Sequence, residues 1–427
     1  MKLKSLVLSV LALGATATQA ACPTWSVANG MNNGKEVCAL TDANPYTGQI
    51  LLTSDKMWVL QGGVFIGVDG GKNGTITIEP GTKIVGKSGA DYLVITRGSQ
   101  IFAEGTAEAP IVFTTGNEGN TSRGQWGGLV INGFAPINVA GGTATGEGST
   151  GVYGGNNPAD NSGVLKYVRV EFAGFEITPD NELNGIAFQG VGSGTTVDYI
   201  QVHKNSDDGV EFFGGTVDVK HVVLTGNRDD SMDWTSGWRG RAQFVIIDQF
   251  EDAANNAIEA DNLSKDMYAI PRSNPVLSNF TILGTKGAGA KGGSALLLRK
   301  GSGVDFQNSI FTGGKKGCLD FDDDATTAQG GIQFIGNFLH CDKAFETEDG
   351  ESANVADYFT SADFNEIMDP MLNGYTPAAG SPVVNLGDVT PFGDARYGTF
   401  FDSVDYAGAV KDANDTWYKG WTNLARD

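Results

Sequence analysis

The stretch "NSDDGVEFFGGTVDVKHVVLTGNRDDSMDW" from Asn205 to Trp234 contains nearly the same pattern twice. Asn-x-Asp-Asp stands at Asn205 and again at Asn227, 22 residues later, with a β-rich run between the copies. A pattern that returns after so few residues, with no room for a helix, is typical of a fold built from short repeated strands. The repetition indicates either the period of such a fold or a site assembled from two adjacent repeats.

The same period extends along the chain. In each copy an apolar residue is followed by two spacers, a core-type residue, one spacer and a third apolar residue. The copies are "LKYVRV" from Leu165, "VDYIQV" from Val197, "VKHVVL" from Val219, and weaker runs from Ala242, Leu277, Phe306 and Phe334. Such short strands can bury their apolar side chains by stacking on copies of themselves. We therefore predict an all-β solenoid of parallel strands, with a β-sandwich as the alternative.

A second strand in the repeat carries an apolar residue followed by an acid. The acids are Glu211, Asp233, Glu259, Asp320 and Glu346, and three of them lie 14 residues after the first apolar anchor of their repeat. Because side chains alternate along a strand, the apolar residue points inward and the acid outward. Stacking in register then predicts an exterior column of carboxylates that Leu297 interrupts. A second column lies two positions further along each strand, and in it one arginine partly offsets the negative charge of three acids. It comprises Asp261, Arg299, Asp322 and Glu348.

Composition and charge narrow the classes of function. Glycine makes up 61 of 427 residues, about double the usual share, which is typical of a fold with many turns. The formal net charge is -21, and a balance that acidic repels phosphate backbones. Nucleic acid is therefore excluded as a partner. The chain holds only three histidines and no CxxC pair, so we expect neither a zinc nor a haem site.

The first 20 residues have the features of a secretory signal peptide. Lys2 and Lys4 precede a short apolar core, and small residues lead to Ala20, the expected cleavage position. Removing both lysines takes the net charge from -21 to -23. No later stretch approaches the roughly 18 apolar residues of a membrane-spanning helix. The four cysteines fit an oxidising compartment, and proximity along the chain suggests the pairs Cys22 with Cys38 and Cys318 with Cys341. We expect an exported protein in the periplasm, on the outer surface or outside the cell.

Four further segments are "GTITIEPGTKIVG", "AEGTAEAPIVFTT", "DNELNGIAFQGVGSGT" and "DDSMDWTSGWRGRAQF". They resemble a widespread group of secreted bacterial proteins of the pectin-lyase-like superfamily, and the similarity covers residues 60 to 425. The resemblance implies a right-handed parallel β-helix and brings little information about activity. We expect an N-terminal cap at 21–60, the β-helix at 61–384 and an aromatic C-terminal tail at 385–427 that packs on the solenoid.

Three interpretations of the carboxylate column at Glu211, Asp233 and Glu259 remain open. It is a solvated acidic face, a calcium or other cation site, or a set of catalytic carboxylates. Like charges about 5 Å apart disfavour joint ionisation, so a cation or a raised pKa is expected to offset them. Asp320 and Asp322 lie in "DFDDDATTAQG", which resembles a calcium loop in composition, although the EF-hand spacing is absent. Calcium is accordingly the cofactor we consider.

Asp207, Asp208, Asp229 and Asp230 are the candidate catalytic residues. Asn-x-Asp in one coil and Asp-Asp in the next resemble half of the site of polygalacturonase-type glycoside hydrolases. Paired carboxylates suit glycosidic cleavage, because one protonates the leaving oxygen while the other activates water. The His-Gly and Arg-x-Lys motifs of that site are missing. The alternative is structural, since Asp and Asn at coil corners bind backbone amides and stack as ladders.

Other candidate binding residues flank these acids. Arg239 and Arg241 are expected mainly to neutralise the acidic corners, and a lyase interpretation would use such cations as the base. Trp234 is a candidate for stacking on sugar rings, with a buried role as the alternative.

Three functions fit these features. The first is an exported module that binds a glycan or other surface polymer, with calcium as a cofactor. The second is a polysaccharide hydrolase or lyase that uses the paired aspartates. The third is a passive structural protein of the surface or matrix.

Overall fold

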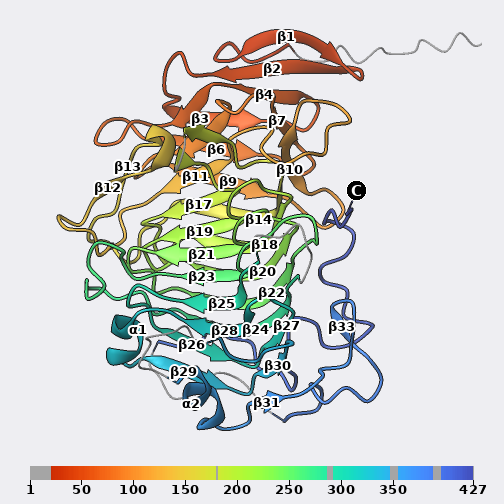
Figure 1. Cartoon of the computed structure of the whole chain (residues 1–427). Helices are drawn as coiled ribbons and strands as arrows, with labels where there is room; N and C mark the ends of the chain where they lie inside the picture. The colour runs from red at the N-terminus through yellow and green to blue at the C-terminus, as the bar shows by residue number, and fades with distance from the viewer. Residues whose placement is uncertain (1–20, 179–180, 286–291, 347–353, 388–395, 427) are drawn as a thin grey trace, which may run out of the picture.

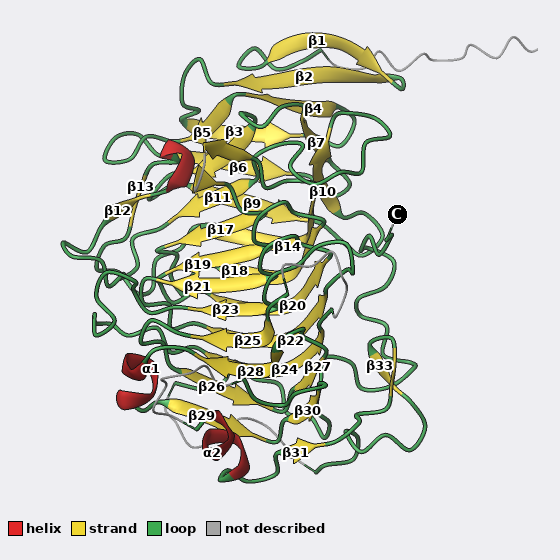
Figure 2. Cartoon of the chain, in the orientation of Figure 1, coloured by secondary structure: helices red, strands yellow, loops and turns green. Residues whose placement is uncertain are grey.

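Parallel strands stacked in one tall solenoid form the protein (Figure 1). The computed structural model describes residues 21–178, 181–285, 292–346, 354–387 and 396–426. Strands dominate these ranges, and the α-helices among them are the short α1 (Asp324–Ala328) and α2 (Val355–Thr360), both near the C-terminal end of the stack (Figure 2). The predicted all-β, right-handed parallel β-helix is confirmed. The predicted signal peptide at 1–20 lies outside the described residues.

Each coil contributes one strand to a nine-stranded parallel sheet. Its strands are β5 (Gly63–Ile66), β8 (Tyr92–Ile95), β11 (Leu129–Asn132), β17 (Ile186–Gln189), β19 (Val210–Phe213), β21 (Met232–Thr235), β23 (Ile258–Ala260), β25 (Ser294–Leu298) and β28 (Gly317–Phe321).

The other strands of the coils form an eighteen-stranded sheet. They are β1 (Val27–Asn32), β2 (Lys35–Thr41), β3 (Gly48–Leu52), β4 (Met57–Gln61), β6 (Gly74–Ile78), β7 (Lys83–Gly86), β9 (Gln100–Glu104), β10 (Ile111–Thr115), β14 (Gly163–Glu171), β18 (Thr196–His203), β20 (Asp218–Thr225), β22 (Arg241–Asp248), β24 (Val276–Leu283), β26 (Val304–Gln307), β27 (Ile310–Thr312), β29 (Ile332–Ile335), β30 (Phe338–His340) and β31 (Glu366–Ile367). Only β1 pairs antiparallel in this sheet, with β2. Parallel pairing starts with β2 on β4, both inside the segment 21–60 expected as a cap apart from Gln61, and β3 from the same segment pairs with β6 beyond it.

A bend divides the long strands of this sheet into two halves. The first half of β14 pairs with β9 and the second half with β10. The residue between the halves, Tyr167, has a left-handed φ of 50°, and the equivalent residues Tyr199 and His221 have φ of 54° and 51°. From β14 onward the bend repeats in each coil, whereas in the earlier coils a loop joins the two halves, so the sheet folds along one line and the solenoid has three faces. Leu165, Val168 and Val170 all point into the core, as the apolar pattern predicts.

Segments outside the repeat cover parts of the solenoid. The insertion between β11 and β14 holds β12 (Ala144–Thr145), β13 (Val152–Tyr153) and the 3₁₀ turn Glu147–Ser149, and it packs Ile137 and Tyr153 on the nine-stranded sheet. A hairpin of β15 (Glu176–Thr178) and β16 (Asn181–Glu182) follows β14. The last described residues, 396–426, lie on the bent sheet, where Trp421 contacts Tyr167 and Tyr199 edge-on. The hairpin of β32 (Leu372–Asn373) and β33 (Thr376–Pro377) precedes them.

Two disulfides lie near the two ends of the strand stack. They join Cys22 to Cys38 and Cys318 to Cys341, the pairs suggested by proximity. No helix among the described residues is long and apolar enough to cross a membrane.

Candidate functional site

An outward-facing column of acids follows the nine-stranded sheet. The register aligns Glu211 on β19 with Asp233 on β21, and Asp233 with Glu259 on β23. Their neighbours Val210, Met232 and Ile258 are buried in the core, because side chains alternate across the sheet. The column continues to Leu297 and then to Asp320, so the predicted interruption occurs where expected.

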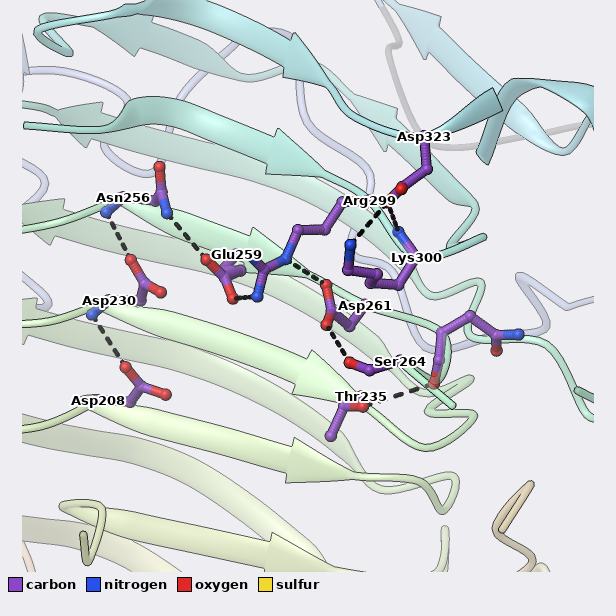
Figure 3. A network of polar contacts seen from close by, with 11 residues as sticks. Asp208, Asp230, Thr235, Asn256, Glu259, Asp261, Ser264, Arg299, Lys300 and Asp323 are labelled. Atoms are coloured by element: carbon purple, nitrogen blue, oxygen red, sulfur yellow. Dashed lines mark hydrogen bonds and ion pairs between the residues drawn. The ribbon is translucent and has the colours of Figure 1, made fainter. Parts of the chain in front are cut away.

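The paired aspartates form a ladder at one corner of the solenoid. An oxygen of Asp208 accepts a hydrogen bond from the backbone N–H of Asp230 at 2.9 Å, and Asp230 accepts from the N–H of Asn256 at 2.5 Å (Figure 3). Asn256 in turn accepts from the N–H of Ser294 at 3.0 Å. Asn227 accepts in the opposite direction along the stack, from the backbone N–H of Asn205 in the preceding coil. Asp208 and Asp230 thus bind backbone amides as the structural interpretation expects, and one oxygen of each is occupied by backbone.

The ladder and the column lie side by side and bring carboxylates close together. Oxygens of Asp208, Glu211 and Asp233 all lie within 4.8 Å of one another, and so do oxygens of Asp230, Asp233 and Glu259. Asp233 belongs to both triads. Its Oδ1 is buried and has no hydrogen-bond partner in the described part of the chain. We call Asp208, Glu211, Asp230, Asp233 and Glu259 the acid cluster.

Burial and mutual repulsion perturb the acid cluster. Burial, and then the charges of Glu147 and Asp207, raises the pKa of Glu211 well above its usual range. Burial, followed by Glu211 and Glu259, does the same to the pKa of Asp233. Without a counter-ion these groups must take up protons or repel one another.

Arg299 compensates one end of the cluster. It pairs with Glu259 and donates from Nε to Asp261 at 2.8 Å, as the second column predicts (Figure 3). Burial still raises the pKa of Glu259 to about 7 against the influence of Arg299. At the other end Glu211 accepts a hydrogen bond at 2.6 Å from the Asn184 amide, which carries no charge. The positive charge is therefore concentrated at the Glu259 end.

Insertions add acids that sequence analysis missed. Burial and then Asp229, Glu182 and Glu147 raise the pKa of Asp207 to about 7. Burial and then Glu182 raise that of Glu147 to about 7. Glu147 comes from the 3₁₀ turn and Glu182 from β16, both outside the repeat. No periodic signal in the sequence could place them here.

The structure corrects two expected binding residues, Trp234 and Arg241. Trp234 is fully buried and donates to Ser302 from inside the solenoid, so it cannot stack on a sugar. It follows the outward Asp233 on β21 and therefore points inward. Arg241 begins β22 on the bent sheet, pairs with Asp218 and donates to the carbonyl of Tyr397 at 3.0 Å. Arg239 is exposed. Arg299, and neither of these two arginines, is the cation that meets the carboxylate column.

Asp320 lies further along the same column. It is fully buried, accepts from the Ser294 hydroxyl at 3.1 Å and lies 3.9 Å from the Lys316 ammonium. Burial and then Asp322 raise its pKa to about 6. Because Lys316 already supplies positive charge, this position is less suited to a cation than the acid cluster. Glu348 of the second column lies outside the described residues.

The donor set of the acid cluster fits calcium. Calcium prefers carboxylate and other hard oxygen ligands at about 2.4 Å, so two ligands of one ion lie up to about 4.8 Å apart. Each triad meets that limit. The cluster offers neither thiolate nor imidazole, which zinc would favour.

Comparison with known proteins adds the family. A family model described as a pectate-lyase like beta helix domain matches residues 44–383, so the chain belongs to that family. Membership suggests a glycan-related role and interaction with polysaccharide. None of the curated proteins compared with the chain matches it.

Proposed function

We propose that the protein is an exported polysaccharide-binding β-helix that holds calcium in the acid cluster. The observation that carries the proposal is the pair of carboxylate triads that share Asp233. A calcium ion there would supply the charge that the Glu211 end lacks. Its remaining coordination positions would accept oxygens of a sugar chain, with uronates the best-suited substrate class because they bring a carboxylate of their own.

Export is part of the same proposal. The signal-peptide features of residues 1–20 support it, and so do the two disulfides, which persist in oxidising compartments. The three-faced solenoid offers a long surface along which an extended polymer can lie.

Binding fits the geometry better than a lyase reaction. Burial acts against the charge on Arg299, but Glu259 and Asp261 outweigh it and raise the pKa of Arg299 further above its usual value. A guanidinium that stays charged cannot abstract a proton from a uronate. A hydrolase is the second candidate, favoured by one observation: with its pKa raised to about 7, Asp207 has the property of a general acid.

Affinity electrophoresis tests the proposal. The mature protein would be run through gels containing polygalacturonate, alginate or dextran, with calcium or with chelator. We expect the two polyuronates to retard it only with calcium, and Asp233→Asn to abolish the retardation. Asp252→Asn is the matched control, because Asp252 pairs with Arg123 at the surface. Unretarded wild-type protein in every calcium gel would contradict the proposal. New reducing ends or unsaturated products would establish an enzyme instead.

A further inference from the structure

One continuous ladder of strands connects the two ends of the solenoid. It starts at β1, passes through β2, β4, β7, β10 and the second halves of the long strands, and ends with β27, β30 and β31. Figure 1 shows β1 at the top of the stack and β31 at the bottom. The first and last strands therefore belong to the same face of the molecule.

Both terminal strands are exposed. Every residue of β1 except the last is exposed, and both residues of β31 are. In the described part of the chain, β1 pairs only with β2 and β31 only with β30. Each end thus offers backbone N–H and C=O groups along an open edge, which is a template for a further strand.

The same ends expose large apolar side chains, beside the polar Asn29 and Asn32 of β1 and Glu366 of β31. Val27 and Met31 of β1 are 53% and 64% exposed, while Phe364 and Ile367 at the other end are 77% and 54% exposed. Terminal repeats of a solenoid ordinarily carry a polar outer face, which keeps them soluble. Apolar side chains on two open edges therefore indicate surfaces that are covered when the protein functions.

A hollow beside β31 could receive apolar side chains. It has a volume of about 500 Å³ and is lined among others by Phe338, Phe364, Met368 and Leu386. Phe364 occupies the left-handed bend position of its coil, and Gly336 occupies that of the coil before. The side chains at the bend position stack from coil to coil. Gly336 has no side chain, so this stack has a gap in the coil next to Phe364.

We propose that copies of the protein associate end to end, with β1 of one copy adding to β31 of the next. A second copy of the chain suits this role, because each copy carries both open edges, β1 at one end of the ladder and β31 at the other. Since β1 runs antiparallel to β2, and β2 shares the direction of the coil strands, β1 would join β31 in antiparallel fashion. Val27 and Met31 would then lie at the apolar end around Ile367 and Phe364. The two surfaces differ, so the contact leaves one free end of each kind and does not close.

Net charge sets the conditions for this association. Each mature copy carries about -23, so copies repel one another at low ionic strength. Salt shortens the range of that repulsion to about 8 Å at physiological ionic strength. Sodium chloride should therefore strengthen the association, the opposite of its effect on contacts made by opposite charges.

Sedimentation velocity on the mature protein with chelator tests this inference, which does not rest on the proposed function. We expect species larger than the monomer that grow with protein and salt concentration. Met31→Lys and Ile367→Lys should each remove self-association, and Ile270→Lys should not, because Ile270 is 83% exposed in a loop on the side of the solenoid. A mixture of Met31→Lys and Ile367→Lys should form dimers, since each variant keeps one intact end.

Three results would overturn the inference. The wild-type protein could stay monomeric at its highest soluble concentration in salt. Association could survive unchanged in both end variants. Met31→Lys could dimerise by itself, which would place two C-terminal ends against each other. Matching circular dichroism spectra and melting curves would show that the lysine variants are folded.

Discussion

Neutralising Asp233 should stabilise the cation-free protein. The oxygens of Asp233 lie within 4.8 Å of carboxylate oxygens from four other residues. At that distance, and an effective dielectric constant of about 20, each pair of ionised carboxylates costs about 3 kcal/mol. Partial protonation of the neighbours relieves some of this repulsion. We therefore expect Asp233→Asn to gain about 1–3 kcal/mol in chelator, which raises the unfolding midpoint by a few degrees.

With calcium bound, wild type should become more stable than Asp233→Asn. An ion that binds only the folded state stabilises it by about 2.7 kcal/mol at one hundred times its dissociation constant. Thermal unfolding followed by circular dichroism at pH 8, at one scan rate, measures the effect with calcium and with chelator. Wild type should gain several degrees from calcium and Asp233→Asn should gain little. Asp252→Asn, a change in a surface pair, should respond like wild type.

The opposite order in chelator would refute the reasoning. If Asp233→Asn unfolds at a lower temperature than wild type there, Asp233 contributes as a structural acceptor and repulsion is not its main effect.

Three further predictions concern the same region. Because folding raises the pKa of Glu259 to about 7, the contribution of this group to stability is fully present below its ordinary pKa and is lost as pH rises through about 7. Cation-free protein should therefore lose thermal stability across that window, and calcium should suppress the loss. Asp230→Ala should cost about 1–3 kcal/mol in denaturant unfolding, because it strands the N–H of Asn256, whereas Asp230→Asn keeps an acceptor there and should cost less. Arg299→Met should destabilise chelated protein by about 1–3 kcal/mol, since Glu259 and Asp261 lose their cation at a partly exposed site, and added calcium should restore more stability than it gives wild type.

The sequence predicts which side chains of the coil strands point inward and which point outward. Once the repeat is recognised, alternation along the strand places Glu211, Asp233 and Glu259 outside and Val210 inside. The same period predicts that Leu297 interrupts the column, because every coil keeps its register. The same alternation along β21 places Trp234, the residue after Asp233, inside the solenoid.

The bend of the sheet and the insertions could not be predicted from the sequence. The bend residues Tyr167, Tyr199 and His221 all adopt left-handed φ, although none is the glycine or asparagine that would mark such a position. Glu147 approaches Glu211, and Glu182 approaches Asp207, from insertions whose path depends on tertiary packing. Arg299 pairs with the acid cluster and Arg241 does not, because Arg241 lies on β22 of the other sheet.

The central claim is that the acid cluster binds calcium, and calorimetric titration of the chelator-treated mature protein tests it most directly. We predict saturable binding with a dissociation constant on the order of 10⁻⁴ M or tighter, weaker binding of magnesium, and loss of the calcium signal in Asp233→Asn. A wild-type titration without heat of binding, or one that Asp233→Asn reproduces, would contradict the account.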